Sequence, residues 1–156
     1  MTTQNAFGKT LLPQVQAFLS KKVHGSVIGG QEVSASNGDT FDTSDPGTGE
    51  KLATVSNMQP DDVERAVAAA QKAFDEADWA RLPGNERGVH LMRLADAVEQ
   101  RKPIIAQIEA LDSGKMEAQA ADDVQNFIDT IRYFCDLAQG LTLDTAIPVA
   151  GHEASV

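Results

Sequence analysis

The sequence contains few of the residues that help a small domain to stabilise itself. Its 156 residues include one cysteine, one tryptophan and one tyrosine, and aromatic residues make up 5% of the chain. A single cysteine excludes an internal disulfide, so a reducing compartment and a cytoplasmic location are the expectation. No run of about 20 apolar residues is present, which predicts no membrane-spanning segment. Residues 7–27 also lack the continuous apolar block of a signal peptide.

Basic residues are scarce as well. The chain has 13 Lys and Arg against 23 Asp and Glu, which gives a net charge of −10. Without a basic stripe, no nucleic acid partner is predicted, and an anionic membrane surface would repel the chain. The three histidines are far apart and lack the spacing of metal ligands. We therefore interpret the acidity as a contribution to solubility.

The chain is nevertheless 42% hydrophobic, and much of that fraction is alanine. Alanine removes little apolar area from water, at about 25 cal/mol per Å² buried. The length fits one ordinary domain. The sequence thus predicts a thin core and a chain suited to docking onto something larger.

The hydrophobic pattern predicts an α+β fold that is mostly helical and begins with a β-hairpin. Residues 1–25 form a leader with a possible short helix at Pro13. Residues 26–56 alternate strands with glycine-containing turns, and together they make a hairpin that would be marginal alone. Four helices are then expected within residues 26–140: at 60–77, at 85–101, from Pro103 to Gly114, and at 117–138. Proline is expected to start the third of these helices anew.

The tail is expected to be extended from Thr145 to Val149. Ala154 to Val156 would begin a return strand that has no room to develop, which leaves a lone strand with an open edge. We interpret residues 141–156 as the start of a longer β structure.

Two residues invite a chemical interpretation. Cys135 lies on the apolar stripe of the last helix beside Phe134, a setting that predicts core packing and not a reactive thiol. Asp112 precedes Ser113 and Gly114 at a helix C-terminus, where a carboxylate opposes the helix dipole. Either a side-chain hydrogen bond or a bound cation would compensate for it.

Six segments in order resemble the N-terminal part of NAD(P)-dependent aldehyde dehydrogenases. They are Ile28-Gly-Gly30, Asp45-Pro-Gly-Thr-Gly-Glu50, the helix from Asp62 to Phe74, Trp79 with Glu86-Arg87, Leu111-Asp-Ser-Gly-Lys115 and Arg132-Tyr-Phe134. The turn segment has Asp45 where the family usually has Asn. The resemblance extends from about Val27 to about Val149 and does not cover the leader.

The resemblance implies that the chain forms the N-terminal part of an α/β, Rossmann-like cofactor domain. Residues 141–156 would enter the strands of an oligomerisation arm. Family enzymes oxidise an aldehyde to a carboxylic acid through a cysteine nucleophile and pass hydride to NAD or NADP. Those reacting groups and the cofactor-binding loop lie further along the family sequence. No catalytic and no cofactor-binding residue is therefore predicted in this chain.

Two family sites do reach into these residues. Many members bind a structural monovalent cation, Na⁺ or K⁺, and the matching positions are Thr43 and Ser44 through backbone carbonyls and Asp112 through its carboxylate. Such an ion prefers hard oxygen ligands. The family's substrate tunnel runs along the last long helix, and Asn126 and Phe127 are the positions expected to line it. Phe127 as simple core packing is the alternative.

The sequence predicts that this chain is an N-terminal aldehyde dehydrogenase segment that is inactive alone. Its partner would be the remainder of such a chain, with a homo-oligomer also possible. Three apolar faces would dock there: Val63 with Phe74, Leu91 with Val98, and Val124 with Ile131. The alternatives are a stand-alone interaction or oligomerisation module and, with less support, a small acidic binding protein, which would need a closed pocket.

Overall fold

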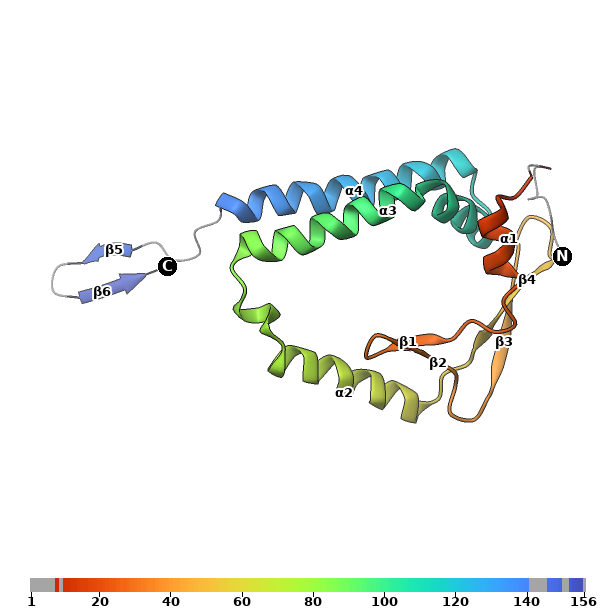
Figure 1. Cartoon of the computed structure of the whole chain (residues 1–156), viewed down its shortest axis with the longest axis horizontal. Coiled ribbons are helices and arrows are strands. Elements are labelled where there is room, and N and C mark those ends of the chain that lie inside the picture. The colour runs from red at the N-terminus through yellow and green to blue at the C-terminus, as the bar shows by residue number, and fades with distance from the viewer. Residues whose placement is uncertain (1–7, 9, 141–145, 150–151, 156) are drawn as a thin grey trace.

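The computed structural model describes residues 8, 10–140, 146–149 and 152–155. Its elements in chain order are α1 (Pro13–Leu19), β1 (Ser26–Ile28), β2 (Gln31–Val33), β3 (Thr40–Ser44), β4 (Lys51–Ser56), α2 (Pro60–Glu76), the 3₁₀ helix η1 (Asp78–Arg81), α3 (Gly84–Ser113), α4 (Glu117–Gly140), β5 (Ala146–Val149) and β6 (His152–Ser155). The long helices α3 and α4 run side by side, and α2 lies on the side of the molecule opposite to them (Figure 1). The mostly helical fold with small antiparallel hairpins confirms the predicted fold class.

The first two hairpins form where glycine permits a reversal. Strands β1 and β2 pair antiparallel around Gly29 and Gly30, whose φ angles are 59° and 80°. Such positive φ angles suit the tight turns that match strand twist. In the β3–β4 turn, Asp45 Oδ1 accepts hydrogen bonds from the backbone N–H groups of Gly47 at 2.7 Å and Thr48 at 3.3 Å. These bonds hold the turn between β3 and β4 in one conformation.

Helix α2 begins with a capping box. The N–H of Gln59 donates to Asp62 Oδ2 at 3.0 Å, and the Gln59 side chain caps the helix in return. The buried Asp62 carboxylate also accepts bonds from the Ser36 N–H and hydroxyl, at 3.0 and 3.1 Å. The backbone hydrogen bonds from Ser36 and Gln59 lower the pKa of Asp62. Asp62 thus fixes the start of α2 to the loop after β2.

Helix α3 runs unbroken through Pro103, so the expected division into two helices is wrong. Proline removes one helical N–H donor and is normally costly in a helix interior. Packing on both sides of the proline offsets that cost, because Ala95 before it and Ala106 after it are both buried against α4. The predicted stop at Gly114 is confirmed, since this residue caps α3 in the left-handed conformation.

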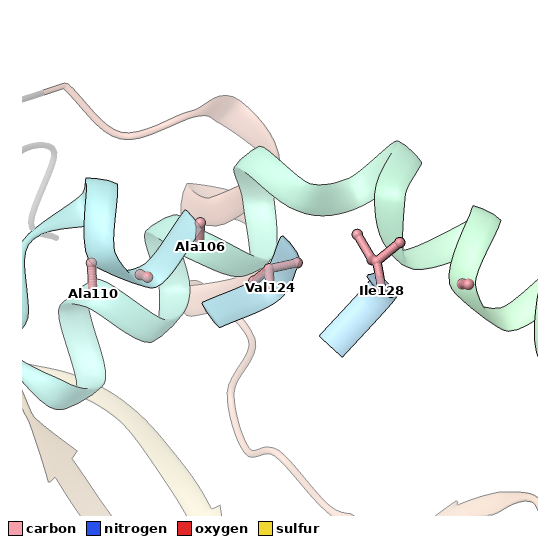
Figure 2. Packing of buried hydrophobic residues seen from close by; sticks show 6 residues of the cluster. Ala106, Ala110, Val124 and Ile128 are labelled. Carbon is pink, nitrogen blue, oxygen red and sulfur yellow. The ribbon is translucent and has the colours of Figure 1, made fainter. Parts of the chain in front are cut away.

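The main core lies between α3 and α4. Its buried members are small or branched: Ala95, Ala106, Ala110, Ala120, Val124 and Ile128. Figure 2 shows Val124 and Ile128 of α4 beside the alanines of α3. Alanine side chains let the two backbones approach closely, which confirms the prediction of a thin, alanine-rich core. Arg132 reinforces the pair with ion pairs to Asp96 at 2.9 Å and Glu99 at 2.7 Å.

A second core ties the leader to the rest of the chain. Leu11 and Val15 are buried with Leu52 and Leu111, and α1 confirms the possible leader helix. The buried Gln107 of α3 accepts a hydrogen bond from the N–H of Leu12 at 2.7 Å. Residues 10–19 of the leader are therefore an integral part of the fold.

The tail differs from its prediction. Strand β6 forms and pairs antiparallel with β5, from Ala146 opposite Ser155 to Val149 opposite His152. A two-residue connection is enough to reverse a chain, so the expectation of a lone strand is wrong. Thr145 and Val156 lie outside the described residues. In the part of the chain that the structure describes, no helix is long and apolar enough to cross a membrane.

Candidate functional site

The structure brings together two of the three predicted cation ligands. Thr43 Oγ1 at the end of β3 donates a hydrogen bond to Asp112 Oδ1 at the end of α3, over 2.9 Å. The two residues are 69 positions apart in the sequence. Thr43 is thus the hydrogen-bond partner that compensates for a carboxylate at a helix C-terminus.

A close contact next to this pair fixes its geometry. Gly114 ends α3 with a φ of 73°, and a Cβ built on it would lie 2.7 Å from Pro46 Cγ. Only glycine combines that φ with so near a neighbour. The β3–β4 turn, which carries Pro46, therefore packs directly onto the end of α3.

Ser44 is the third predicted ligand and the last residue of β3. The pairing register shifts between Thr43 and Ser44, whose partners are Ala53 and Lys51. Leu52, the extra residue, is buried in the second core. Backbone carbonyls and a carboxylate are oxygen ligands of the kind that a hard cation prefers. Among residues 8, 10–140, 146–149 and 152–155, no three His, Cys, Asp or Glu side chains gather where they could hold a metal ion. The cation therefore stays a prediction.

The two predicted tunnel residues lie on the outer side of α4. Asn126 is exposed, and Phe127 is 47% exposed, so Phe127 is not simple core packing. Phe134 and Leu137 are exposed about two and about three turns further along the same helix. The Tyr133 and Phe134 rings meet edge to face at 5.2 Å. An aromatic-rich surface therefore runs along α4, and its role as a tunnel wall stays a prediction.

Cys135 is buried on the face of α4 that packs against α3, next to Gly88. A thiol needs partial exposure to act as a nucleophile. The predicted packing role is confirmed by this burial.

Sequence reasoning missed a groove of about 630 Å³ that the leader creates. Its lining includes the buried apolar Leu52 and Leu111 and the polar Lys21, His24 and Glu32. Lys21 pairs with Glu32, and this hydrogen bond is the main cause of the lowered pKa of Glu32. The apolar pairs of the leader were the signal that could have located the groove. Only the folded chain brings α1, β4 and α3 together around it.

Two of the three predicted docking faces are corrected. Val124 is buried against α3 and Ile131 packs beside it, so this face is internal. Val98 also packs against the main core, whereas Leu91 of the same predicted face is partly exposed. The hydrophobic period identified the apolar sides of both helices but not that they face each other.

The remaining predicted face lies open on α2. Val63 is 54% exposed, Val67 is 61% exposed and Phe74 is 74% exposed. These residues recur at helical spacing on one side of α2, and Figure 1 shows α2 apart from the α3–α4 pair. Large apolar side chains gathered on one exposed face mark an interaction surface.

Comparison with known sequences matches this chain to aldehyde dehydrogenases. The Aldehyde dehydrogenase family profile matches residues 33–156. A mitochondrial benzaldehyde dehydrogenase of Antirrhinum majus is 43% identical over 121 residues, which cover 75% of this chain and 23% of the relative. A putative aldehyde dehydrogenase of Bacillus subtilis is 38% identical over 141 residues, which cover 88% of this chain and 28% of the relative.

Comparison with solved structures agrees. The NAD⁺ complex of an aldehyde dehydrogenase from Bacillus cereus matches 90% of this chain with a TM-score of 0.82 and 36% identity. This chain covers 28% of that protein. The chain thus spans about a quarter of the length of these three relatives.

Proposed function

Because this chain belongs to the aldehyde dehydrogenase family, we propose that it supplies the N-terminal segment of an enzyme that oxidises an aldehyde to a carboxylic acid. NAD⁺ or NADP⁺ accepts the hydride in such an enzyme. Support comes from the family match over residues 33–156 and from the NAD⁺ complex of the Bacillus cereus relative.

The observation that carries the proposal is a structural match over 90% of this chain that spans only part of the relative's length. The matching region keeps a TM-score of 0.82 yet represents 28% of the relative. Its cysteine is buried in the core. We therefore propose that the segment provides shape, and that the reacting groups belong to the rest of the fold.

The same proposal includes the features that the family implies. The Thr43–Asp112 junction, with Ser44, would hold Na⁺ or K⁺, and Asn126 and Phe127 would line the substrate tunnel. The partner is the remainder of an aldehyde dehydrogenase, within a cytoplasmic homo-oligomer.

A dehydrogenase assay tests whether this chain lacks the reacting groups. The purified 156-residue chain is offered NAD⁺ and NADP⁺ with several aliphatic and aromatic aldehydes, and NADH or NADPH formation is followed. We expect no turnover. Turnover that Cys135→Ser abolishes would contradict the proposal, because it would make a buried core residue the nucleophile.

A second candidate is a stand-alone interaction or oligomerisation module. The exposed apolar residues of α2 and α4 favour it, since a self-pairing module also needs such surfaces. Size-exclusion chromatography with light scattering distinguishes the two. A tight oligomer of defined size favours the module, and a monomer favours the segment of a larger fold.

A further inference from the structure

The turn between β2 and β3 contains the one place in the sequence where glycine follows asparagine. Asn37 and Gly38 are both exposed. Gly38 has a φ of 74°, and a Cβ built on it would meet nothing within 4 Å. A glycine nitrogen has no side chain beside it to block its approach to a neighbouring group. The Asn37 amide therefore has an unhindered nucleophile next to it in the chain.

These two residues have the groups for a reaction within the main chain, and asparagine is among the thermolabile residues. The Gly38 backbone nitrogen adds to Asn37 Cγ, the Cγ–Nδ2 bond breaks, and Nδ2 leaves as ammonia with the proton that the backbone nitrogen gives up. The product is a cyclic succinimide. Water then opens the ring. Attack at Cγ gives aspartate, and attack at the backbone carbonyl gives isoaspartate, in which the main chain runs through the side chain.

A hydrogen bond within the turn favours the first step. The N–H of Asp39 donates to Asn37 Oδ1 over 2.8 Å. Negative charge develops on that oxygen when the nitrogen adds to Cγ, and a donor already in place stabilises it. The same bond keeps the Asn37 side chain folded back along the main chain of Gly38.

A second hydrogen bond has to open before the nitrogen is free. The N–H of Gly38 donates to the carbonyl oxygen of Ala35 over 2.9 Å. Because Gly38 is exposed at the end of a short turn, this opening is local and costs less than unfolding the whole chain. The folded turn therefore still permits the reaction.

Two other exposed asparagines lack these features. Asn57 is followed by Met58, and Asn126 is followed by Phe127. Asn126 also lies within α4, where the N–H of the next residue belongs to the helical hydrogen bonding. Both residues are internal controls for Asn37.

The residue before Asn37 holds the start of α2. The N–H and the hydroxyl of Ser36 both donate to Oδ2 of the buried Asp62, at 3.0 and 3.1 Å. Isoaspartate would lengthen the main chain by one carbon atom directly after Ser36 and add a carboxylate there. The position of the Ser36 donors would change, and the new negative charge would disfavour a second carboxylate nearby.

From these observations we propose that Asn37 is a site of spontaneous deamidation, and that its isoaspartyl form releases Ser36 from Asp62 and loosens the start of α2. The reaction needs only this chain and water. It therefore does not depend on the activity of the enzyme to which the chain belongs.

Incubation of the purified wild-type chain at mildly alkaline pH tests the site. Ion exchange separates the chains that have gained a negative charge, and peptide mass spectrometry locates aspartate and isoaspartate. Asn37→Gln is the matched control, because glutamine keeps the amide but its longer side chain closes such a ring far more slowly. Hydrogen exchange of residues 62–66 then reports on the start of α2.

We expect position 37 to gain acid at least about tenfold faster than position 126, because α4 has to open before the backbone nitrogen after Asn126 is free. Residues 62–66 should exchange about tenfold faster in the isoaspartyl fraction than in the unmodified chain, because hydrogen bonds to a charged group are lost. The Asn37→Gln chain, incubated alongside, should keep its exchange rate.

Similar rates of acid formation at positions 37 and 126 would overturn the modification site. So would equal rates at position 37 in the wild type and in Asn37→Gln. Unchanged exchange of residues 62–66 in the isoaspartyl fraction would overturn the release of Ser36 from Asp62. Equal acceleration in the incubated Asn37→Gln chain would overturn it as well, because the change at α2 would then not come from residue 37.

Discussion

Two neighbouring residues of α4 should respond very differently to truncation. Ile128 is completely buried in the α3–α4 core, whereas Phe127 is about half exposed. Removing Ile128 atoms costs both their transfer free energy and the cavity left behind, about 2–5 kcal/mol for Ile→Ala. Its core neighbours include Ala95, Ala106 and Ala110, which have no spare atoms to fill a void. We therefore expect Ile128→Ala to lower the free energy of unfolding by about 3–4 kcal/mol.

Phe127→Ala provides the matched control. The larger side chain is removed, but much of it is already in water, so we expect a loss below about 1 kcal/mol. Ile128→Val should cost about 0.5–1.5 kcal/mol, well below the loss from Ile128→Ala. The loss from Ile128→Ala is a large fraction of the about 5–15 kcal/mol that stabilises an ordinary domain.

Urea unfolding followed by circular dichroism measures all three variants, with the free energy extrapolated linearly to water. A loss from Phe127→Ala as large as that from Ile128→Ala would show that burial against α3 does not set the cost. A loss from Ile128→Ala below about 1 kcal/mol would show that the α3–α4 core does not determine stability.

Three further substitutions test other contacts. Gly114→Ala should destabilise the chain by about 1–2 kcal/mol, because the residue has a positive φ; its new Cβ would also meet Pro46, so adding Pro46→Ala should recover part of the loss in urea unfolding. Gln107→Leu should lower the free energy of unfolding by about 1–3 kcal/mol, because it leaves the backbone N–H of Leu12 without its acceptor. Hydrogen exchange of residues 10–19 should accelerate, and unchanged exchange would show that Gln107 does not hold α1 in place. Asp62→Asn should make stability less sensitive to acid. The folded pKa of Asp62 lies below that of an unfolded aspartate, about 3.9, so its contribution is complete above that pH and is lost as the pH falls through the folded pKa. The free energy of unfolding, measured from pH 5 downward, should therefore decline less steeply in the variant than in the wild type. An equal decline would show that ionised Asp62 does not stabilise the start of α2.

Much of the fold follows from local signals in the sequence. Paired glycines predicted the reversal after β1, the helical period predicted α2 and α4, and Gly114 marked the end of α3. These features depend on backbone preferences of a few adjacent residues, which are visible in sequence.

The errors arose where distant packing outweighs local preference. Pro103 would end an isolated helix, but burial against α4 on both sides keeps α3 continuous. Val124 and Ile131 were recognised as apolar, yet their partner could be identified only once α3 and α4 were placed together. The leader groove likewise depends on Leu11 and Val15 reaching residues about 100 positions away.

The candidate cation junction shows both the value and the limit of sequence reasoning. Asp112 was singled out because a carboxylate at a helix C-terminus needs compensation, and Thr43 provides it. The choice of Thr43 came from the family resemblance, because no local pattern connects β3 to the end of α3.

The activity of a reconstituted complex decides whether this chain supplies shape while the rest of the fold supplies the reacting groups. The wild-type chain is co-expressed with the complementary part of the Bacillus cereus relative, and the purified one-to-one complex is given NAD⁺ and an aldehyde. Our account predicts that the complex forms NADH while each part alone does not. NADH formation by this chain alone, or a complex that assembles in that ratio and stays inert, would contradict it.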